Sequence, residues 1–299
     1  MTTAAVREKT DVAALVAGLV TVGLWGSAFV GIRAASPSFS PGALALGRLV
    51  VSGLILGAVA LIRRERLPAR RDLILIAVYG VLWLAVYSAT LNAAERTVDA
   101  GTAAMLINTG PILIAVLAGL FLHEGFPRGL FMGSLIAFAG CVMIGFAKTQ
   151  SAGGASLGIA LLIVAAVAYA IAVVVQKPVL ARVAPFQVTW IGVMAGAIAL
   201  LPFAPTLAGE VTRAGAPAIA WMVYLGAFPT ALGFATWTFA LRRTSAGRMG
   251  SLTYLIPLVA IFLGWVLLGE SPPGLALAGG ALCVAGVYLA RRGPANLKA

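Results

Sequence analysis

Long apolar segments separated by short polar stretches recur along the whole chain. A helix that crosses the hydrocarbon core of a bilayer needs about 20 consecutive apolar residues. Segments of this length follow one another with loops too short to hold a soluble domain, so the pattern predicts an all-α integral membrane protein with ten transmembrane helices. The predicted spans are residues 12–33, 41–62, 73–92, 98–122, 128–147, 156–176, 184–204, 217–241, 246–269 and 273–291.

One part of this pattern occurs twice. Residues 101–140 align without a gap on residues 247–286 at an offset of 146, which pairs Pro111 with Pro257 and Glu124 with Glu270. An apolar background would match many leucines and alanines by chance, but not prolines, a glutamate and several glycines in one register. An internal duplication of this kind should be recognised before the fold is assigned. We therefore predict two five-helix repeats, residues 12–147 and 156–291.

The positions of the charged residues predict how the chain is oriented in the membrane. The net charge is +12, but the basic residues lie almost wholly at the ends of apolar segments, so we expect a lipid bilayer and no nucleic acid as the partner. A cytoplasmic N-terminus would put 16 of the 21 lysines and arginines on the inside. The positive-inside rule then predicts that both termini are cytoplasmic, in a multi-pass protein of the cell (inner) membrane. Because five spans is an odd number, the two repeats would have inverted topology.

Composition agrees with the membrane class. The chain is 61% hydrophobic and 10% charged, whereas soluble domains carry about 25% charged residues. Cys141 and Cys283 both lie inside apolar segments, where they are expected to be packing residues and not a disulfide or metal ligands. We expect no metal and no cofactor.

Several motifs resemble those of one transporter family. The first span contains Leu24-Trp25-Gly26-Ser27-Ala28-Phe29, and the second begins at Pro41 and contains Arg48. The element from Pro111 through Glu124 to Pro127 is repeated from Pro257 through Glu270 to Pro273. With these motifs the chain resembles the drug/metabolite transporter superfamily, specifically its EamA-type permeases, over nearly its whole length. The resemblance implies a ten-helix carrier with both termini inside, of a family in which many members export amino acids or other small metabolites. One departure is Gly192, which occupies the position equivalent to Arg48.

The two repeated prolines are the first candidates for a functional role. Pro111 and Pro257 fall within predicted spans, where a proline removes a backbone hydrogen bond and kinks the helix. The freed carbonyl must be satisfied by a neighbouring group or by water in a cavity. Asn108 and Tyr254 lie three residues before the two prolines. Both a kink beside a polar cavity and a purely structural kink fit this pattern.

The charged candidates are interpreted differently. Glu124 and Glu270 lie at helix ends, and we expect them to cap the N-terminal amides of the helix that follows each of them. Arg48 is the one charge well inside a span, which makes it a possible charge site for a substrate carboxylate. A structural pairing with Glu95 or Asp99 is the alternative.

Aromatic and polar positions complete the predicted substrate cavity. Tyr79, Trp83 and Tyr87 recur every four residues and so share one helix face. The resemblance places spans 1, 3, 4, 6, 8 and 9 around the cavity. The predicted cavity residues are Trp25, Ser27, Tyr79, Trp83, Tyr87, Asn108, Tyr169, Trp237 and Tyr254.

These observations favour an alternating-access secondary transporter, an exporter of a small organic metabolite such as an amino acid. The alternatives are a sugar or nucleotide-sugar carrier of the same superfamily and a channel, although no ring of like charges is visible. An enzyme is disfavoured, because the chain has one histidine and no acid deep inside a predicted span. We expect a small-molecule substrate and a monomer or weak homodimer.

Overall fold

The computed structural model of the chain describes residues 11–64, 67–94, 96, 106–148, 155–268 and 274–292. Within these ranges the chain forms helices joined by turns, without strands. Seven of the described helices are long and apolar enough to cross a membrane, and one further pair passes the same test together but is bent by 55°. The described chain is therefore an all-helical integral membrane protein.

Each predicted span of the first half contains helix. The span at 73–92 is a continuous helix in three segments, and α6 covers the later part of the span at 98–122, whose beginning lies outside the described residues. The elements are α1 (Val12–Ala35), α2 (Pro41–Arg63), α3 (Arg70–Tyr79), the π-helix η1 (Gly80–Tyr87), α4 (Ser88–Ala94), α6 (Gly110–Phe121) and α7 (Arg128–Lys148).

The second half follows the same order. The predicted span at 217–241 again contains a π-helix, and the span at 246–269 contains a short 3₁₀ segment. The elements are α8 (Ala155–Val179), α9 (Pro185–Ala199), η2 (Leu201–Phe203), α10 (Ala204–Val211), α11 (Ala216–Leu225), the π-helix η3 (Gly226–Leu232), α12 (Gly233–Arg243), α13 (Ala246–Ser251), η4 (Leu252–Leu255), α14 (Ile256–Leu268) and α15 (Gly274–Arg292).

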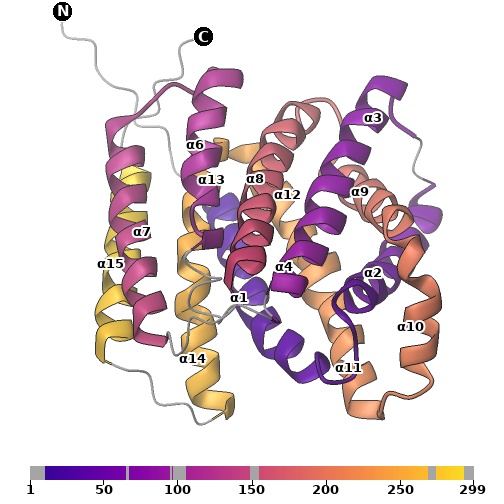
Figure 1. Cartoon of the computed structure of the whole chain (residues 1–299). Coiled ribbons are helices and arrows are strands. Elements are labelled where there is room, and N and C mark those ends of the chain that lie inside the picture. The colour runs from indigo at the N-terminus through magenta and orange to yellow at the C-terminus, as the bar shows by residue number, and fades with distance from the viewer. Residues whose placement is uncertain are drawn as a thin grey trace, which may run out of the picture.

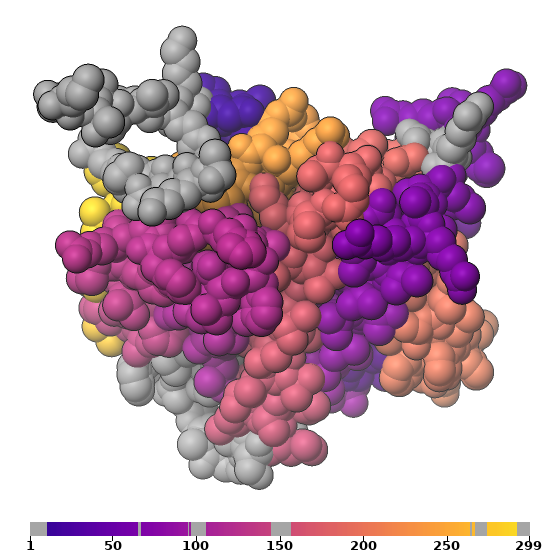
Figure 2. Space-filling view, turned by 90° about the horizontal axis from the view of Figure 1, so that it is seen from above, coloured from indigo at the N-terminus to yellow at the C-terminus, as the bar shows by residue number. Residues whose placement is uncertain are grey.

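The helices form a bundle in which segments of the two halves alternate (Figure 1). α1 packs against α12 and α14 of the second half, and α8 packs against η1 and α6 of the first. Seen from above, α6 and α7 form one flank and α3 lies on the opposite flank, with α8 between them (Figure 2). The core where α1, η1, α8 and α12 meet therefore draws on both halves.

α7 and α15 form a separate close pair at the edge of the bundle (Figure 1). A Cβ atom on Gly133 would lie 2.5 Å from the carbonyl oxygen of Gly286, and one on Gly279 would lie 2.6 Å from that of Gly140. Small residues let helix backbones approach in this way. Because the earlier glycine of α7 meets the later glycine of α15, the two helices run antiparallel. The free thiols of Cys141 and Cys283 lie 3.6 Å apart in this interface.

Candidate functional site

Most of the aromatic side chains predicted to line the cavity gather around Trp83. The centroid of its ring lies 4.8 Å from that of Tyr169 and 5.2 Å from that of Trp237. Trp25 stacks on Trp237 with centroids 5.2 Å apart. Offset-stacked and edge-to-face contacts of this kind are the arrangements that aromatic rings favour. We call this group the aromatic cluster, and its members are Trp25, Tyr79, Trp83, Tyr87, Tyr169, Phe234 and Trp237.

The aromatic cluster is tightly packed. Trp83 is 2% exposed and Trp237 is 0% exposed, and their rings touch each other instead of bordering open space. The cluster joins α1 and η1 of the first half to α8 and α12 of the second. In this structure the predicted cavity position is therefore a closed contact between the two halves.

Several polar atoms at this contact have no hydrogen-bond partner among the described residues. The hydroxyl groups of Tyr79 and Tyr169 and the Nε2 atom of Gln176 are buried and form no hydrogen bond of good geometry with a described residue, although Tyr79 lies near Gln176 and Tyr169 lies near Thr253. The Oε1 atom of the same Gln176 side chain accepts a hydrogen bond of 3.2 Å from the indole of Trp237. A buried polar group left unpaired costs about 1–3 kcal/mol. Such groups are typical of a site that binds another molecule in part of its working cycle.

Three other predicted cavity residues, Ser27, Asn108 and Tyr254, are not members of the aromatic cluster. The hydroxyl group of Ser27 hydrogen-bonds the hydroxyl group of Tyr224 at 2.7 Å, which fastens α1 to α11. Asn108 is buried next to the start of α6, and a Cβ atom on Gly110 would lie 2.6 Å from Tyr169. Tyr254 is fully buried, and its own hydroxyl group is unpartnered among the described residues.

The two prolines lie where the regular α-helical pattern is interrupted, and whether either one kinks its span stays a prediction. Pro111 is the second residue of α6 and follows a turn at Asn108 and Thr109. Pro257 is the second residue of α14 and follows the 3₁₀ segment η4. A proline at the first turn of a helix sacrifices no intrahelical hydrogen bond. Pro111 therefore lies just after a turn, and Pro257 lies just after a 3₁₀ segment within a continuous helical stretch.

Arg48 faces the second π-helix. Its Nη2 atom lies 3.3 Å from the hydroxyl oxygen of Thr230, to which it donates a hydrogen bond. Thr230 donates in turn to the carbonyl oxygen of Leu225 at 2.7 Å. The alternative partners named from the sequence, Glu95 and Asp99, lie outside the described residues.

Glu124 caps a helix, but a different one from the helix predicted. Its two carboxylate oxygens accept hydrogen bonds from the backbone amides of Ala246 at 2.8 Å and Gly247 at 3.3 Å, at the start of α13. We predicted that it would cap the helix that follows it, α7. The carboxylate is favoured at α13 because the amide groups and the dipole of a helix N-terminus attract negative charge. Glu270 lies outside the described residues.

The end of the bundle that carries Glu124 is held by further polar contacts. Lys177 donates to the carbonyl oxygens of Leu241 and Thr244, both at 2.6 Å. Arg182 forms an ion pair with Asp72 at 2.6 Å, and this carboxylate raises the pKa of the Arg182 guanidinium. The Lys177 contacts lie within the second half, whereas the Arg182–Asp72 ion pair and the Glu124 cap join the first half to the second at this end of the molecule.

Some residues of the site were missed in the sequence. Gln176 carried a usable signal, because it is an isolated amide at the end of an apolar segment. Phe234 carried none, since one more phenylalanine in an apolar helix is indistinguishable from a packing residue. Thr21 and Thr236 were also missed as a pair, although their hydroxyl oxygens lie 2.8 Å apart between α1 and α12.

A bundle of bilayer-length apolar helices with its polar and aromatic groups turned inward defines a polytopic membrane protein. Its sequence matches the model of the EamA-like transporter family twice, over residues 12–146 and 156–292. The chain therefore belongs to the EamA-like transporter family and is a transporter, not an enzyme.

Individual relatives agree with this assignment. The chain is 37% identical to a probable terminal-alkyne amino-acid exporter of Streptantibioticus cattleyicolor, over 92% of each chain. It is 33% identical to the uncharacterized transporter YdfC of Bacillus subtilis, over 94% of this chain and 91% of the relative. A solved structure described as "Crystal structure of protein" matches the fold with a TM-score of 0.77 at 21% identity, covering 94% of this chain and 98% of the other.

Proposed function

We propose that the protein is an alternating-access exporter of a small organic metabolite, an amino acid or a similar compound, in the cell inner membrane. The proposal comprises ten transmembrane helices in two inverted repeats, with both termini in the cytoplasm. The observation that carries it is the aromatic cluster, a buried contact between the halves that contains unpartnered hydroxyl groups.

The helix contacts support inverted repeats. At the offset of 146, Gly133 is equivalent to Gly279 and Gly140 to Gly286. Gly133 of α7 approaches Gly286 of α15, and Gly140 of α7 approaches Gly279 of α15. This crossed pairing of equivalent positions is what a pseudo-twofold axis between the two helices produces. The π-helices begin at equivalent positions, Gly80 and Gly226. Inverted repeats around a central site are a common architecture of secondary transporters.

Two closed contacts support alternating access. The aromatic cluster fills the centre, and polar contacts such as those of Glu124 and Arg182 hold one end of the bundle together. A carrier must break and reform such contacts as its halves move. The basic residues at this end, including Lys177 and Arg182, support a cytoplasmic location for it.

The proposed substrate class, an amino acid or a similar compound, is supported by the side chains of the aromatic cluster and by the name of one relative. Aromatic walls with a few hydroxyl and amide groups suit a molecule with an apolar body and a small polar part. A relative that is 37% identical is named as a probable amino-acid exporter. A nucleotide sugar would require more hydrogen-bonding groups and cations than the aromatic cluster offers.

Metabolite release tests the proposal. Cells that express the protein and cells that lack it would be loaded with amino acids, and the medium would be analysed by mass spectrometry. We expect one or a few amino acids to appear several-fold faster with the protein. Release of sugars or nucleotide sugars instead would favour the alternative carrier, and an unchanged medium would contradict export.

Variants link export to the aromatic cluster. Trp237→Ala and Asn108→Ala should reduce release while the protein still reaches the membrane in folded form. Leu54→Ala is the matched control, because Leu54 is 70% exposed on the outside of the bundle. Unchanged release by both site variants would rule out this location.

A further inference from the structure

The connection between α2 and α3 is rich in arginine. Residues 61–72 contain five arginines and two acidic residues. One of these acids, Asp72, is paired with Arg182 at 2.6 Å, so most of the positive charge of the connection is left without an acid within it. That ion pair also places the start of α3 at the end of the bundle that carries Glu124. Four of the arginines are described and exposed, and we call them the arginine cluster: Arg63, Arg64, Arg70 and Arg71.

The arginine cluster has no counter-charge among the described residues. None of its members forms an ion pair with a described residue, and the guanidinium of Arg63 lies over the ring of Phe186, 4.9 Å from its centroid. Other basic residues at this end find partners within the chain, since Lys177 donates to two backbone carbonyl oxygens and Arg243 pairs with Asp11. The positive-inside rule explains why basic residues gather at this end, but not why four neighbouring ones lack an acid.

Arg70 and Arg71 occupy an unfavourable position in their helix. They are the first two residues of α3, where the helix dipole repels cations. The N-cap residue, Ala69, supplies no side-chain hydrogen bond to the first amides. Asp72 is the acid of this turn, but its carboxylate accepts hydrogen bonds from Arg182. An anion from outside the chain would offset both guanidinium groups and accept from the first-turn amides at the same time.

Exposed apolar side chains flank the arginine cluster. Leu61 and Ile62 precede it on α2 and are 80% and 81% exposed, and Ile74 follows it on α3 with 56% exposed. Seen from above, the chain around the end of α2 and the start of α3 projects from one corner of the bundle (Figure 2). The surface therefore combines cations at the membrane face with apolar side chains that border them, as a phospholipid with a negative headgroup requires.

We infer that the arginine cluster binds an anionic phospholipid, with its phosphate at Arg70, Arg71 and the first amides of α3 and its acyl chains along the exposed apolar sides of α2 and α3. Each basic residue near an anionic membrane surface raises the association constant by about fivefold. The leaflet concerned is the cytoplasmic one in the proposed topology. The inference goes beyond the proposed transport function, because lipid binding requires neither a substrate nor flux.

Lipid competition tests the inference. The purified full chain in detergent micelles would be incubated with radiolabelled phosphatidylglycerol, and the bound lipid would be counted after capture of the protein. Unlabelled phosphatidylglycerol should displace the label at least about tenfold more effectively than phosphatidylcholine with the same acyl chains, because only the former has a net negative charge. Equal displacement by the two lipids would overturn the inference.

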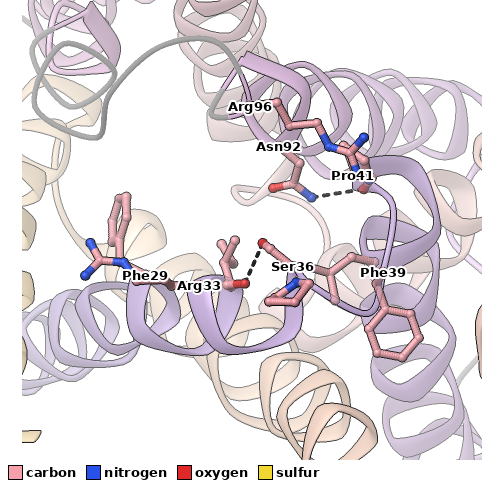
Figure 3. Close-up of a pocket in the computed structure, with 10 residues that line it drawn as sticks. Phe29, Arg33, Ser36, Phe39, Pro41, Asn92 and Arg96 are labelled. Carbon is pink, nitrogen blue, oxygen red and sulfur yellow. Dashed lines mark hydrogen bonds between the residues drawn. The ribbon is translucent and has the colours of Figure 1, made fainter. Parts of the chain in front are cut away.

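Variants locate the lipid. The double variant Arg70→Gln with Arg71→Gln should raise the Kd for phosphatidylglycerol by about tenfold or more. Arg96→Gln with Arg213→Gln is the matched control, because it removes two positive charges from the opposite end. Arg96 borders a pocket beside Asn92 there (Figure 3), and Arg213 donates to a backbone carbonyl oxygen of α10. The control should keep the wild-type Kd. An equal rise in both double variants, or none in the first, would overturn the inference.

A soluble phosphate compound is the other source of such an anion, and a further competitor separates it from a lipid. Glycerophosphate carries the phosphate of the headgroup without acyl chains, so it should leave the labelled lipid bound. Displacement by glycerophosphate at the concentration at which phosphatidylglycerol acts would overturn the inference in favour of a soluble ligand. Export from cells is a separate measurement, so failure of the proposed function and failure of this site are distinguishable.

Discussion

At the scale of single residues, we expect the hydroxyl groups of Tyr79 and Tyr169 in the aromatic cluster to lower folding stability and to be needed for export. Tyr79→Phe and Tyr169→Phe each remove a buried hydroxyl group that forms no hydrogen bond of good geometry with a described residue. We expect the free energy of unfolding of the purified protein to rise by about 1 kcal/mol, and we expect the rate of export to fall several-fold. Thermal unfolding and metabolite release would be measured on the same variants.

Tyr224→Phe supplies the contrast for this pair. The hydroxyl group of Tyr224 bonds Ser27 at 2.7 Å, so its removal should lower stability by about 1 kcal/mol. If Tyr79→Phe lowered stability to the same extent as Tyr224→Phe, the Tyr79 hydroxyl would have a partner and the interpretation of the site would fail.

Glu124 offers a second test at this scale. Glu124→Ala removes both acceptors from the amides of Ala246 and Gly247, and loss of a helix cap costs about 0.5–2 kcal/mol. Glu124→Gln keeps one acceptor oxygen without the charge, so its stability should lie between those of the wild type and the alanine variant. Thermal unfolding measures the order of the three. Equal stability of all three would mean that the cap contributes nothing.

The residue scale also shows where prediction from the sequence stopped. The grouping of Tyr79, Trp83 and Tyr169 could be predicted, because helical spacing puts Tyr79 and Trp83 on one face and the family resemblance places the span of Tyr169 around the same cavity. The partner of Glu124 could not, because Ala246 is 122 residues away in the sequence and a cap is otherwise expected from local context.

At the scale of elements, hydropathy located the helices but not the breaks within them. Apolar length alone predicts a span, because every backbone group in a bilayer must be satisfied within the chain. A π-helix and an α-helix place apolar residues in the same segment, so η1 and η3 leave no distinct hydropathy signal. The prolines were noticed, but only the structure shows that Pro111 lies just after a turn and Pro257 just after a 3₁₀ segment.

The π-helices provide a prediction at this scale. A Cβ atom on Gly80 would collide with the carbonyl oxygen of Gly192, and one on Gly226 would lie 2.6 Å from the Cβ atom of Val51. Gly80→Ala and Gly226→Ala should therefore destabilise the protein by about 1–3 kcal/mol through overpacking. The unfolding temperature of each variant measures this effect.

Gly57→Ala is the control for both substitutions. A Cβ atom on Gly57 would meet nothing within 4 Å, so alanine should leave stability unchanged or raise it by up to about 1 kcal/mol. If all three variants behaved alike, the close approach of the π-helices to α2 and α9 would not limit the packing.

At the scale of the whole molecule, the proposed orientation depends on charge, and two exposed positions can test it. Ala181 lies in the turn before α9, next to the Arg182–Asp72 ion pair, and Thr212 lies in the turn after α10. The proposed topology puts Ala181 inside and Thr212 outside. The native thiols, Cys141 and Cys283, are 1% and 0% exposed, so they should react slowly with a thiol reagent and leave a low background.

Cysteines introduced at these positions should then react from opposite sides. In intact cells, a membrane-impermeant maleimide should label Thr212→Cys, and it should label Ala181→Cys only after the membrane is permeabilised. The reason is the positive-inside rule, which places the basic end of the bundle in the cytoplasm. The reverse labelling would invert the orientation while leaving the repeats intact. Labelling of both positions from one side would contradict a span between them and, with it, the pairing of α9 with α2 as equivalent helices of two inverted repeats.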